Sequence, residues 1–137
     1  MLRYIYAYLV YTWGGLHRLF GNQNRIRSEH ERAIHYFTRA LEIYPSFHRV
    51  RLERGILHYR ELRQHEEALT DFNTLLAQDP DDAPALLNRA LVYQENGRYA
   101  EALIDLEKYV HLPQARDFQE EAYKIAALLR QMLDKDV

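Results

Sequence analysis

The chain has 137 residues, of which 47% are hydrophobic and 28% charged, a balance that is typical of a globular protein and excludes a disordered one. It contains no cysteine, which excludes a disulfide framework and thiolate metal sites. Residues 1–65 hold eleven arginines against five glutamates, whereas residues 66–137 hold seven basic and fifteen acidic side chains. Either the first half attracts an acidic partner, or the charge of solvated helix faces simply varies along the chain.

The first predicted element is a helix over residues 2–20. At 100° per residue, six large apolar side chains share one face, which we predict to lie in the core: Leu2, Ile5, Leu9, Trp13, Leu16 and Phe20. Three tyrosines lie on nearly the opposite side, and we predict that they form an interface: Tyr4, Tyr8 and Tyr11. No charge occurs from Tyr4 to Leu16, so both sides of this helix should be covered.

Three interpretations account for what covers the tyrosine side. Tyrosine and tryptophan suit a protein interface, and they also suit the headgroup region of a membrane. In the second case the lipid would meet the neighbouring basic residues, which are Arg3, His17, Arg18, Arg25 and Arg27. The third interpretation is a homodimer formed by two copies of the helix.

The same segment is a poor candidate for crossing a membrane. Its thirteen uncharged residues are fewer than the roughly 20 that a bilayer requires. Four tyrosines and a tryptophan also differ from the apolar core of a signal peptide. We therefore expect a cytoplasmic chain, with association of residues 1–20 with a membrane surface as the alternative.

The next three segments share one design, in which apolar residues recur at helical spacing over residues 28–45, 46–80 and 81–113. When the last two segments are aligned, the matching residues are Arg54 with Arg89, Ala68 with Ala102, Leu69 with Leu103, Asp71 with Asp105, and Phe72 with Leu106. Prolines at positions 45, 80 and 113 are 35 and 33 residues apart. A period near 34 predicts stacked helix–turn–helix units that bury their apolar faces against one another.

The expected helix ends carry their own chemistry. The predicted N-caps are Ser28, which forms a capping box with Glu31, and Ser46 and Asp82. Asn96-Gly97 predicts a left-handed turn between two helices. Residues 114–137 predict a last helix with one apolar and one charged face, which would cover the final unit. The chain is thus predicted to form seven helices.

The segment NRALVYQENGRYAEAL resembles the middle section of the tetratricopeptide repeat. Small residues occupy that family's two close helix contacts, at Gly55 and Ala90 and at Ala33, Ala68 and Ala102. The resemblance implies an all-α, right-handed α-solenoid of about three helix–turn–helix repeats, in one domain over residues 1–137. Its parts would be an aromatic N-terminal helix and loop (1–27), repeat units (28–45, 46–80 and 81–113) and a capping helix (114–137).

The resemblance also implies a concave groove that binds a peptide and is lined by the first helix of each unit. The implied groove residues are Arg49, Leu52, Glu53, Ile56, Tyr59, Arg60, Leu87, Asn88, Leu91 and Gln94. Asn88 occupies a position where relatives bind a peptide backbone, but Glu53 takes that position one unit earlier. Relatives that bind a chaperone's carboxylate tail carry Lys and Asn where this chain has Leu52, Ile56 and Leu91, which argues against that partner.

We instead expect the groove to hold an apolar segment flanked by acidic residues, because arginine binds carboxylates through two parallel hydrogen bonds. Arg49 and Arg60 would supply these contacts. The alternative is that the leucines belong to the core and the arginines are solvated.

Nothing in the sequence indicates catalysis, a metal or a cofactor. His30 and His35 are five residues apart, which places the two rings about 140° apart on a helix, so we interpret them as exposed or capping residues. No glycine-rich loop precedes a lysine, and both serines are predicted caps. The sequence predicts a non-enzymatic protein-binding scaffold, adaptor or assembly factor. The alternatives are a membrane-associated tether and, as the weakest, nucleic-acid binding by the Arg-rich half.

Overall fold

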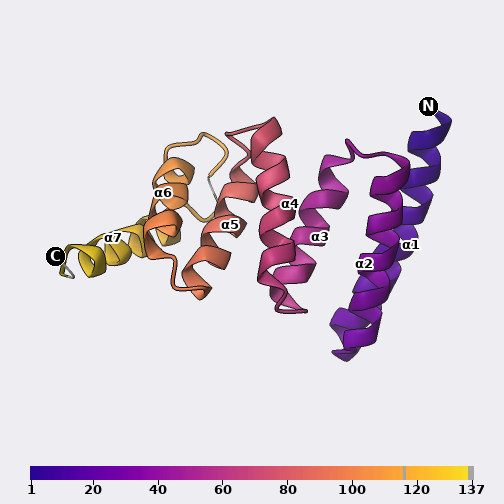
Figure 1. Ribbon diagram of the computed structural model, residues 1–137, viewed down its shortest axis with the longest axis horizontal. Helices are drawn as coiled ribbons and strands as arrows, with labels where there is room; N and C mark the ends of the chain where they lie inside the picture. Colours follow the sequence, from indigo (N-terminus) through magenta and orange to yellow (C-terminus); the bar gives the residue numbers. More distant parts are fainter. Residues whose placement is uncertain (116, 136–137) are drawn as a thin grey trace. The chain divides into compact units, whose positions relative to one another are not determined.

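The computed structural model describes residues 1–115 and 117–135, and this part of the chain forms seven α-helices and no strand (Figure 1). The helices are α1 (Leu2–Asn24), α2 (Arg27–Ile43), α3 (His48–Arg60), α4 (His65–Gln78), α5 (Ala83–Glu95), α6 (Tyr99–Val110) and α7 (Gln119–Lys135). The all-α prediction is therefore confirmed. The chain divides into two compact units, Met1–Asp71 and Phe72–Val137, and the prediction of a single domain stays a prediction.

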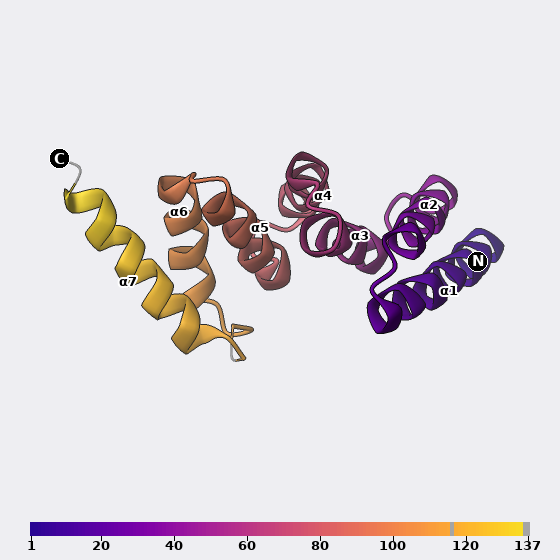
Figure 2. The same ribbon diagram turned by 90° about the horizontal axis from the view of Figure 1, so that it is seen from below.

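Unit 1 (Met1–Asp71) is built on the hairpin of α1 and α2, which run side by side in opposite directions (Figures 1 and 2). The third helix, α3, packs against α2. The buried side chains that join these helices are Ala7, Tyr11, Ala33, Phe37, Ala40, Leu41, Phe47, Val50 and Leu57. Burial of large apolar side chains of this kind is the main term that stabilises the unit.

Small residues at every seventh position let α1 approach α2 closely. Ala7, Gly14 and Gly21 are all buried on the side that faces α2. A Cβ atom added to Gly14 would lie 2.9 Å from the Phe37 ring, and one added to Gly21 would lie 2.7 Å from the ring of His30. Since two turns of a helix span about seven residues, the three small residues form one continuous strip.

The predicted core face of the first helix is wrong. The side chains of Leu2, Ile5, Leu9, Trp13, Leu16 and Phe20 are between 48% and 83% exposed, and we call this side the outer face of α1. The sequence pattern identified a real apolar face, but α1 packs through its small residues instead. That packing brings the backbones of α1 and α2 close together and turns the large side chains away from α2. The helix also continues beyond residue 20, to a left-handed C-cap at Arg25.

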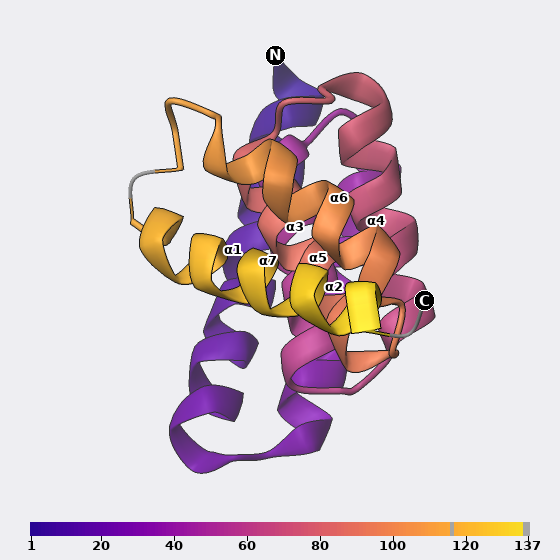
Figure 3. The same ribbon diagram turned by 90° about the vertical axis from the view of Figure 1, so that its left-hand side faces the viewer.

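Unit 2 (Phe72–Val137) contains α5, α6 and α7, with α6 packed against both of its neighbours. Figure 3 shows α7 nearest the viewer, running across α5 and α6. Ala122, Ala126 and Leu129 of α7 are buried, as the predicted capping helix requires. Phe118 lies before the first residue of α7 and is exposed.

The structure corrects two of the predicted helix starts. α2 begins at Arg27 behind the N-cap Ile26, so Ser28 lies inside the first turn, where Glu31 pairs with Arg27 at 3.0 Å. α3 begins behind Phe47, and the Ser46 side chain caps nothing. The other two boundary predictions are confirmed. The Asp82 carboxylate accepts from Ala85 N–H at 3.0 Å, and Gly97 has φ 72°.

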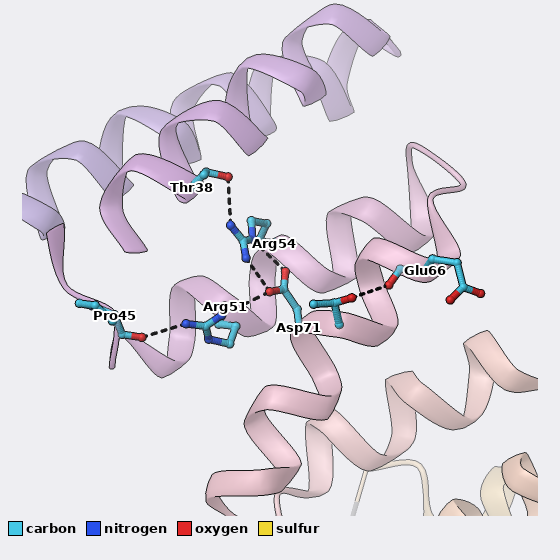
Figure 4. A network of polar contacts seen from close by, with 7 residues as sticks. Thr38, Pro45, Arg51, Arg54, Glu66 and Asp71 are labelled. Atoms are coloured by element: carbon cyan, nitrogen blue, oxygen red, sulfur yellow. Dashed lines mark hydrogen bonds and ion pairs between the residues drawn. The ribbon is translucent and has the colours of Figure 1, made fainter. Parts of the chain in front are cut away.

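An arginine clamp around a buried aspartate fixes α3 to both helices that flank it in the sequence (Figure 4). Arg54 donates two hydrogen bonds to the Asp71 carboxylate, at 2.8 and 2.6 Å, and a third to Thr38 Oγ1 at 3.0 Å. Arg51 lies beside the same carboxylate at 3.6 Å and donates to the Pro45 carbonyl. Asp71 is 1% exposed, so its charge is stabilised by these partners rather than by water.

Unit 2 repeats the clamp with the residues that the sequence alignment pairs. Arg89 donates to both oxygens of Asp105 at 2.7 Å and to Asn73 Oδ1 at 2.9 Å. The hydrogen bond to Asp105 raises the pKa of Arg89, which keeps the guanidinium charged. The alignment detected these residues as repeated, but it did not reveal that each Arg binds the Asp seventeen or sixteen positions later.

Candidate functional site

The groove residues predicted in unit 1 all lie on α3 and differ in exposure. Arg49 and Arg60 are exposed, Leu52, Glu53 and Ile56 are partly buried, and Tyr59 is buried. Leu52 and Ile56 are therefore accessible along one side of α3, while Tyr59 belongs to the interior. This placement gives the unit a surface of aliphatic and arginine side chains, and its function as a groove stays a prediction.

Glu53 is the centre of a polar cluster that joins α1 to α3. Its Oε1 atom accepts from the Tyr11 hydroxyl at 3.0 Å and from Arg49 Nε at 2.9 Å. Its Oε2 atom lies 3.1 Å from Arg18 Nη1. One carboxylate thus faces two guanidinium groups, which leaves the cluster with an excess of positive charge.

The cluster changes the ionisation of its members. Burial, followed by the charge of Glu53 and the hydrogen bond to it, raises the pKa of Tyr11 above the usual value of a tyrosine. The hydrogen bond to Glu53 is the main cause that raises the pKa of Arg49. The Arg49 guanidinium also lies over the Tyr11 ring, 5.7 Å from its centroid, which restrains the side chain.

A hollow of about 180 Å³ opens between α1 and α3 beside this cluster. It is lined by Arg18, Asn22, Glu53, Ile56, Leu57, Arg60 and Glu61. Arg60 stands exposed at its edge, and Ile56 supplies an apolar wall. The hollow is large enough for one side chain, and its charged lining consists of two arginines and two glutamates.

The predicted groove set lacks four residues of this hollow: Leu57 and Glu61 at the end of α3, and Arg18 and Asn22, which belong to α1. The signal that could have found Arg18 and Asn22 is the spacing of α1 itself. Tyr11, Arg18 and Asn22 recur at intervals of seven and four residues, so they share a side of the helix. We had assigned this helix through its large apolar residues, which lie on the outer face.

The tyrosine side of α1 is largely used inside unit 1. Tyr11 is 8% exposed and packs against Phe37 and Phe47, so it is not a surface contact as predicted. Tyr4 and Tyr8 also contact Phe47, and close to half of each side chain remains exposed. A role for these two tyrosines in binding a partner stays a prediction.

The groove residues predicted in unit 2 lie on α5. Leu87, Leu91 and Gln94 are partly buried and present a mostly apolar surface. Asn88 is 7% exposed, and its Nδ2 donates to the Pro84 carbonyl at 2.8 Å. Its Oδ1 is buried without a hydrogen-bond partner, which is an unfavourable arrangement for an amide oxygen.

Two histidines considered as metal ligands serve other roles. His30, which was expected to be an exposed or a capping residue, is buried, and its Nε2 lies 2.8 Å from Asn22 Oδ1. His35 is exposed and its ring lies edge-on to Tyr36. Within residues 1–115 and 117–135, no helix is both long enough and apolar enough to cross a bilayer.

Comparison with known proteins places these features in a family. The family model described as tetratricopeptide repeat matches residues 59–134, which is more than half of the chain. A UDP-N-acetylglucosamine–peptide N-acetylglucosaminyltransferase of Giardia intestinalis is 34% identical over 88 residues, or 64% of this chain. The chain spans only 6% of that relative's length.

Solved structures show the same fold. A tetratricopeptide repeat protein from Parabacteroides merdae matches with a TM-score of 0.77 and 26% identity, over 93% of this chain and 47% of that one. The first TPR domain of Spaghetti (RPAP3), bound to the HSP90 peptide SRMEEVD, matches with a TM-score of 0.70 and 20% identity, over 88% and 93%. The chain is a member of the tetratricopeptide repeat family, with an all-α helical-repeat fold.

Proposed function

We propose that this chain is a non-enzymatic scaffold that holds an extended segment of a partner protein on α1 and α3 of unit 1. Membership of the tetratricopeptide repeat family supports this proposal. So does the Spaghetti domain of the same fold, which holds a peptide. The fold alone does not specify the ligand, so the ligand's chemistry must be argued from the residues of this chain.

The observation that carries the proposal is the hollow between α1 and α3. It combines Arg18 and Arg60 with the apolar side chain of Ile56. Glu53 faces both Arg18 and Arg49, so neither guanidinium is fully neutralised by it. An acidic side chain that enters the hollow would meet Arg60 at the edge and Arg18 further in, where a charge-assisted hydrogen bond is stronger than in open water.

Neighbouring aliphatic side chains define the rest of the proposed ligand. Leu52 belongs to α3, as does Ile56, and both side chains are partly buried. None of these positions carries the Lys or Asn with which relatives bind a terminal carboxylate. We therefore propose a segment with alternating apolar and acidic side chains, recognised inside its sequence rather than by its C-terminus.

The test uses an array of seven-residue peptides in which leucine alternates with glutamate, and a matched array with glutamine in place of glutamate. Fluorescence anisotropy should show that the intact chain binds the glutamate series more tightly. Arg60→Glu should weaken that binding by tenfold or more, because it places a like charge beside the ligand's carboxylate. Arg39→Glu is the control, since Arg39 is an exposed arginine of α2 that pairs with Glu42.

Two results would contradict the proposal. Equal binding of the glutamate and glutamine peptides would show that the ligand does not need an acidic side chain. Equal losses in the Arg60 and Arg39 variants would show that binding depends on net charge and not on the hollow.

A further inference from the structure

The outer face of α1 repeats with a period of seven residues. Leucines occur at positions 2, 9 and 16, and aromatic side chains at positions 6, 13 and 20, and all six are more than half exposed. A strict seven-residue repeat of large apolar side chains is typical of a helix that packs lengthwise against another helix. In unit 1 the partner helix α2 contacts the opposite side, so this repeat is unused.

The charges around the outer face argue against a lipid surface as its occupant. Arg3 donates to the Ile43 carbonyl at 2.9 Å, and Arg18 pairs with Glu53 at 3.1 Å. Both guanidinium groups are therefore directed into unit 1. Two of the basic residues that would hold anionic headgroups are therefore engaged within unit 1.

The order of the side chains makes the outer face complementary to itself. If two copies of α1 lie antiparallel about residue 11, each position i faces position 22 − i of the partner. Leu2 then faces Phe20, Tyr6 faces Leu16, and Leu9 faces Trp13. Every aromatic ring meets a leucine, so the larger side chains of one helix fit between the larger side chains of the other.

We propose that a second copy of this chain covers the outer face, and that the two α1 helices pack antiparallel in a two-fold symmetric homodimer. In such a dimer each residue pair occurs twice, which doubles the effect of a favourable contact. The proposal depends only on α1 and is independent of the proposed groove function.

The size of the face fits a stable dimer. Besides the six residues of the repeat, Ile5 and Leu19 are exposed at its edge. A large side chain that is half exposed presents roughly 100 Å², so the eight together present on the order of 800 Å². That is about the area that each partner buries in a specific protein interface.

The first experiment measures the mass of the full chain by light scattering and sedimentation equilibrium, from low micromolar to near-millimolar concentration. We expect twice the 16.4 kDa of one chain at the upper end. Leu9→Glu should restore the single-chain mass, because it buries a charge opposite Trp13. Ile104→Glu is the matched control, since Ile104 is an exposed apolar residue of α6, and the dimer should persist.

The second experiment tests the orientation and uses the absence of cysteine in the chain. In the antiparallel pair, position 12 lies roughly 3 Å along the axis from its counterpart, and position 5 roughly 18 Å, at 1.5 Å per residue. A short bis-maleimide should therefore link Thr12→Cys dimers and leave Ile5→Cys dimers unlinked. The mass of each variant is measured first, to show that it still associates.

Each alternative gives a distinct result. A single-chain mass at every concentration overturns the proposal, as does a dimer that Leu9→Glu leaves intact. Equal linkage at positions 5 and 12 indicates parallel helices and overturns the antiparallel arrangement. Flotation of a single-chain species with phosphatidylserine vesicles, lost in Leu9→Glu, would show that lipid is the occupant instead.

Discussion

At the scale of single residues, Glu53 determines much of the chemistry of unit 1. Its carboxylate receives Tyr11 from α1 and Arg49 from its own helix. Tyr11 is thereby held between an apolar core, at Phe37 and Phe47, and a negative charge. Both surroundings disfavour the ionised form of its phenol.

This arrangement predicts a loss of stability in alkali. The folded state holds the Tyr11 proton more tightly than the unfolded chain, whose tyrosines titrate near pH ~10. Unfolding therefore releases a proton above about pH 10, and the free energy of unfolding falls as the pH rises through that range. Tyr11→Phe should make this fall shallower in urea unfolding measured between neutral pH and pH ~11.

Tyr123→Phe provides the comparison, because Tyr123 is half exposed on α7. It should keep the slope of the unaltered chain. If Tyr11→Phe and Tyr123→Phe give the same slope, Tyr11 does not carry this pH dependence.

At the scale of the helix, two adjacent glycines of α1 allow the effect of side-chain packing on stability to be measured apart from the effect of helix propensity. Gly14 faces Phe37 and Tyr36, and an added Cβ would lie 2.9 Å from both. Gly15, the next residue, has nothing within 4 Å of such an atom. Both positions are helical, so the intrinsic gain from alanine should be equal.

We expect Gly14→Ala to lower the free energy of unfolding by about 1–2 kcal/mol, because the cost of overpacking exceeds the gain in helix propensity. Gly15→Ala should raise it by up to about 1 kcal/mol. Urea denaturation followed by circular dichroism measures both. If Gly14→Ala raised the free energy of unfolding, α1 and α2 would be able to move apart at no cost in stability.

The two clamps operate at the scale of the hairpin and give a paired prediction. Asp71→Asn and Asp105→Asn each remove the charge of a buried aspartate that pairs with a partly buried arginine. Each should lower the free energy of unfolding by about 3 kcal/mol, the usual cost of breaking a buried ion pair. Asp134→Asn, outside both clamps, is the control and should change it by less than about 0.5 kcal/mol. Losses no larger than that of the control would show that the clamps contribute little.

At the scale of the whole chain, the repeats could be predicted because each repeat gives the same signal again. The turn at Gly97 and the cap at Asp82 depend on local sequence, and both are present in the structure. The sequence showed the residues of the clamps only as aligned positions. It could not predict that Arg54 binds Asp71, because that contact depends on how the two helices cross.

The candidate site was harder to predict because it depends on which side of α1 is buried. The large apolar residues predicted that one side of α1 is buried, whereas in the structure the opposite side is buried, through the close packing of Gly14 and Gly21. Periodicity measures where apolar side chains are, not which face the backbone can bring nearest to a neighbour. Arg18 and Asn22 were missed for that reason.

Because of the clamp, each repeat carries both the arginine and the aspartate that binds it. Residues 46–80 contain Arg54 with its own acceptor Asp71, and also Asn73, which receives the arginine of the following repeat. A gene in which this segment is duplicated in tandem would encode, in every copy, an arginine, the aspartate that accepts from it, and an asparagine that accepts from the arginine of the next copy. The chain could therefore be lengthened by whole repeats without leaving the guanidinium group of any clamp unpaired.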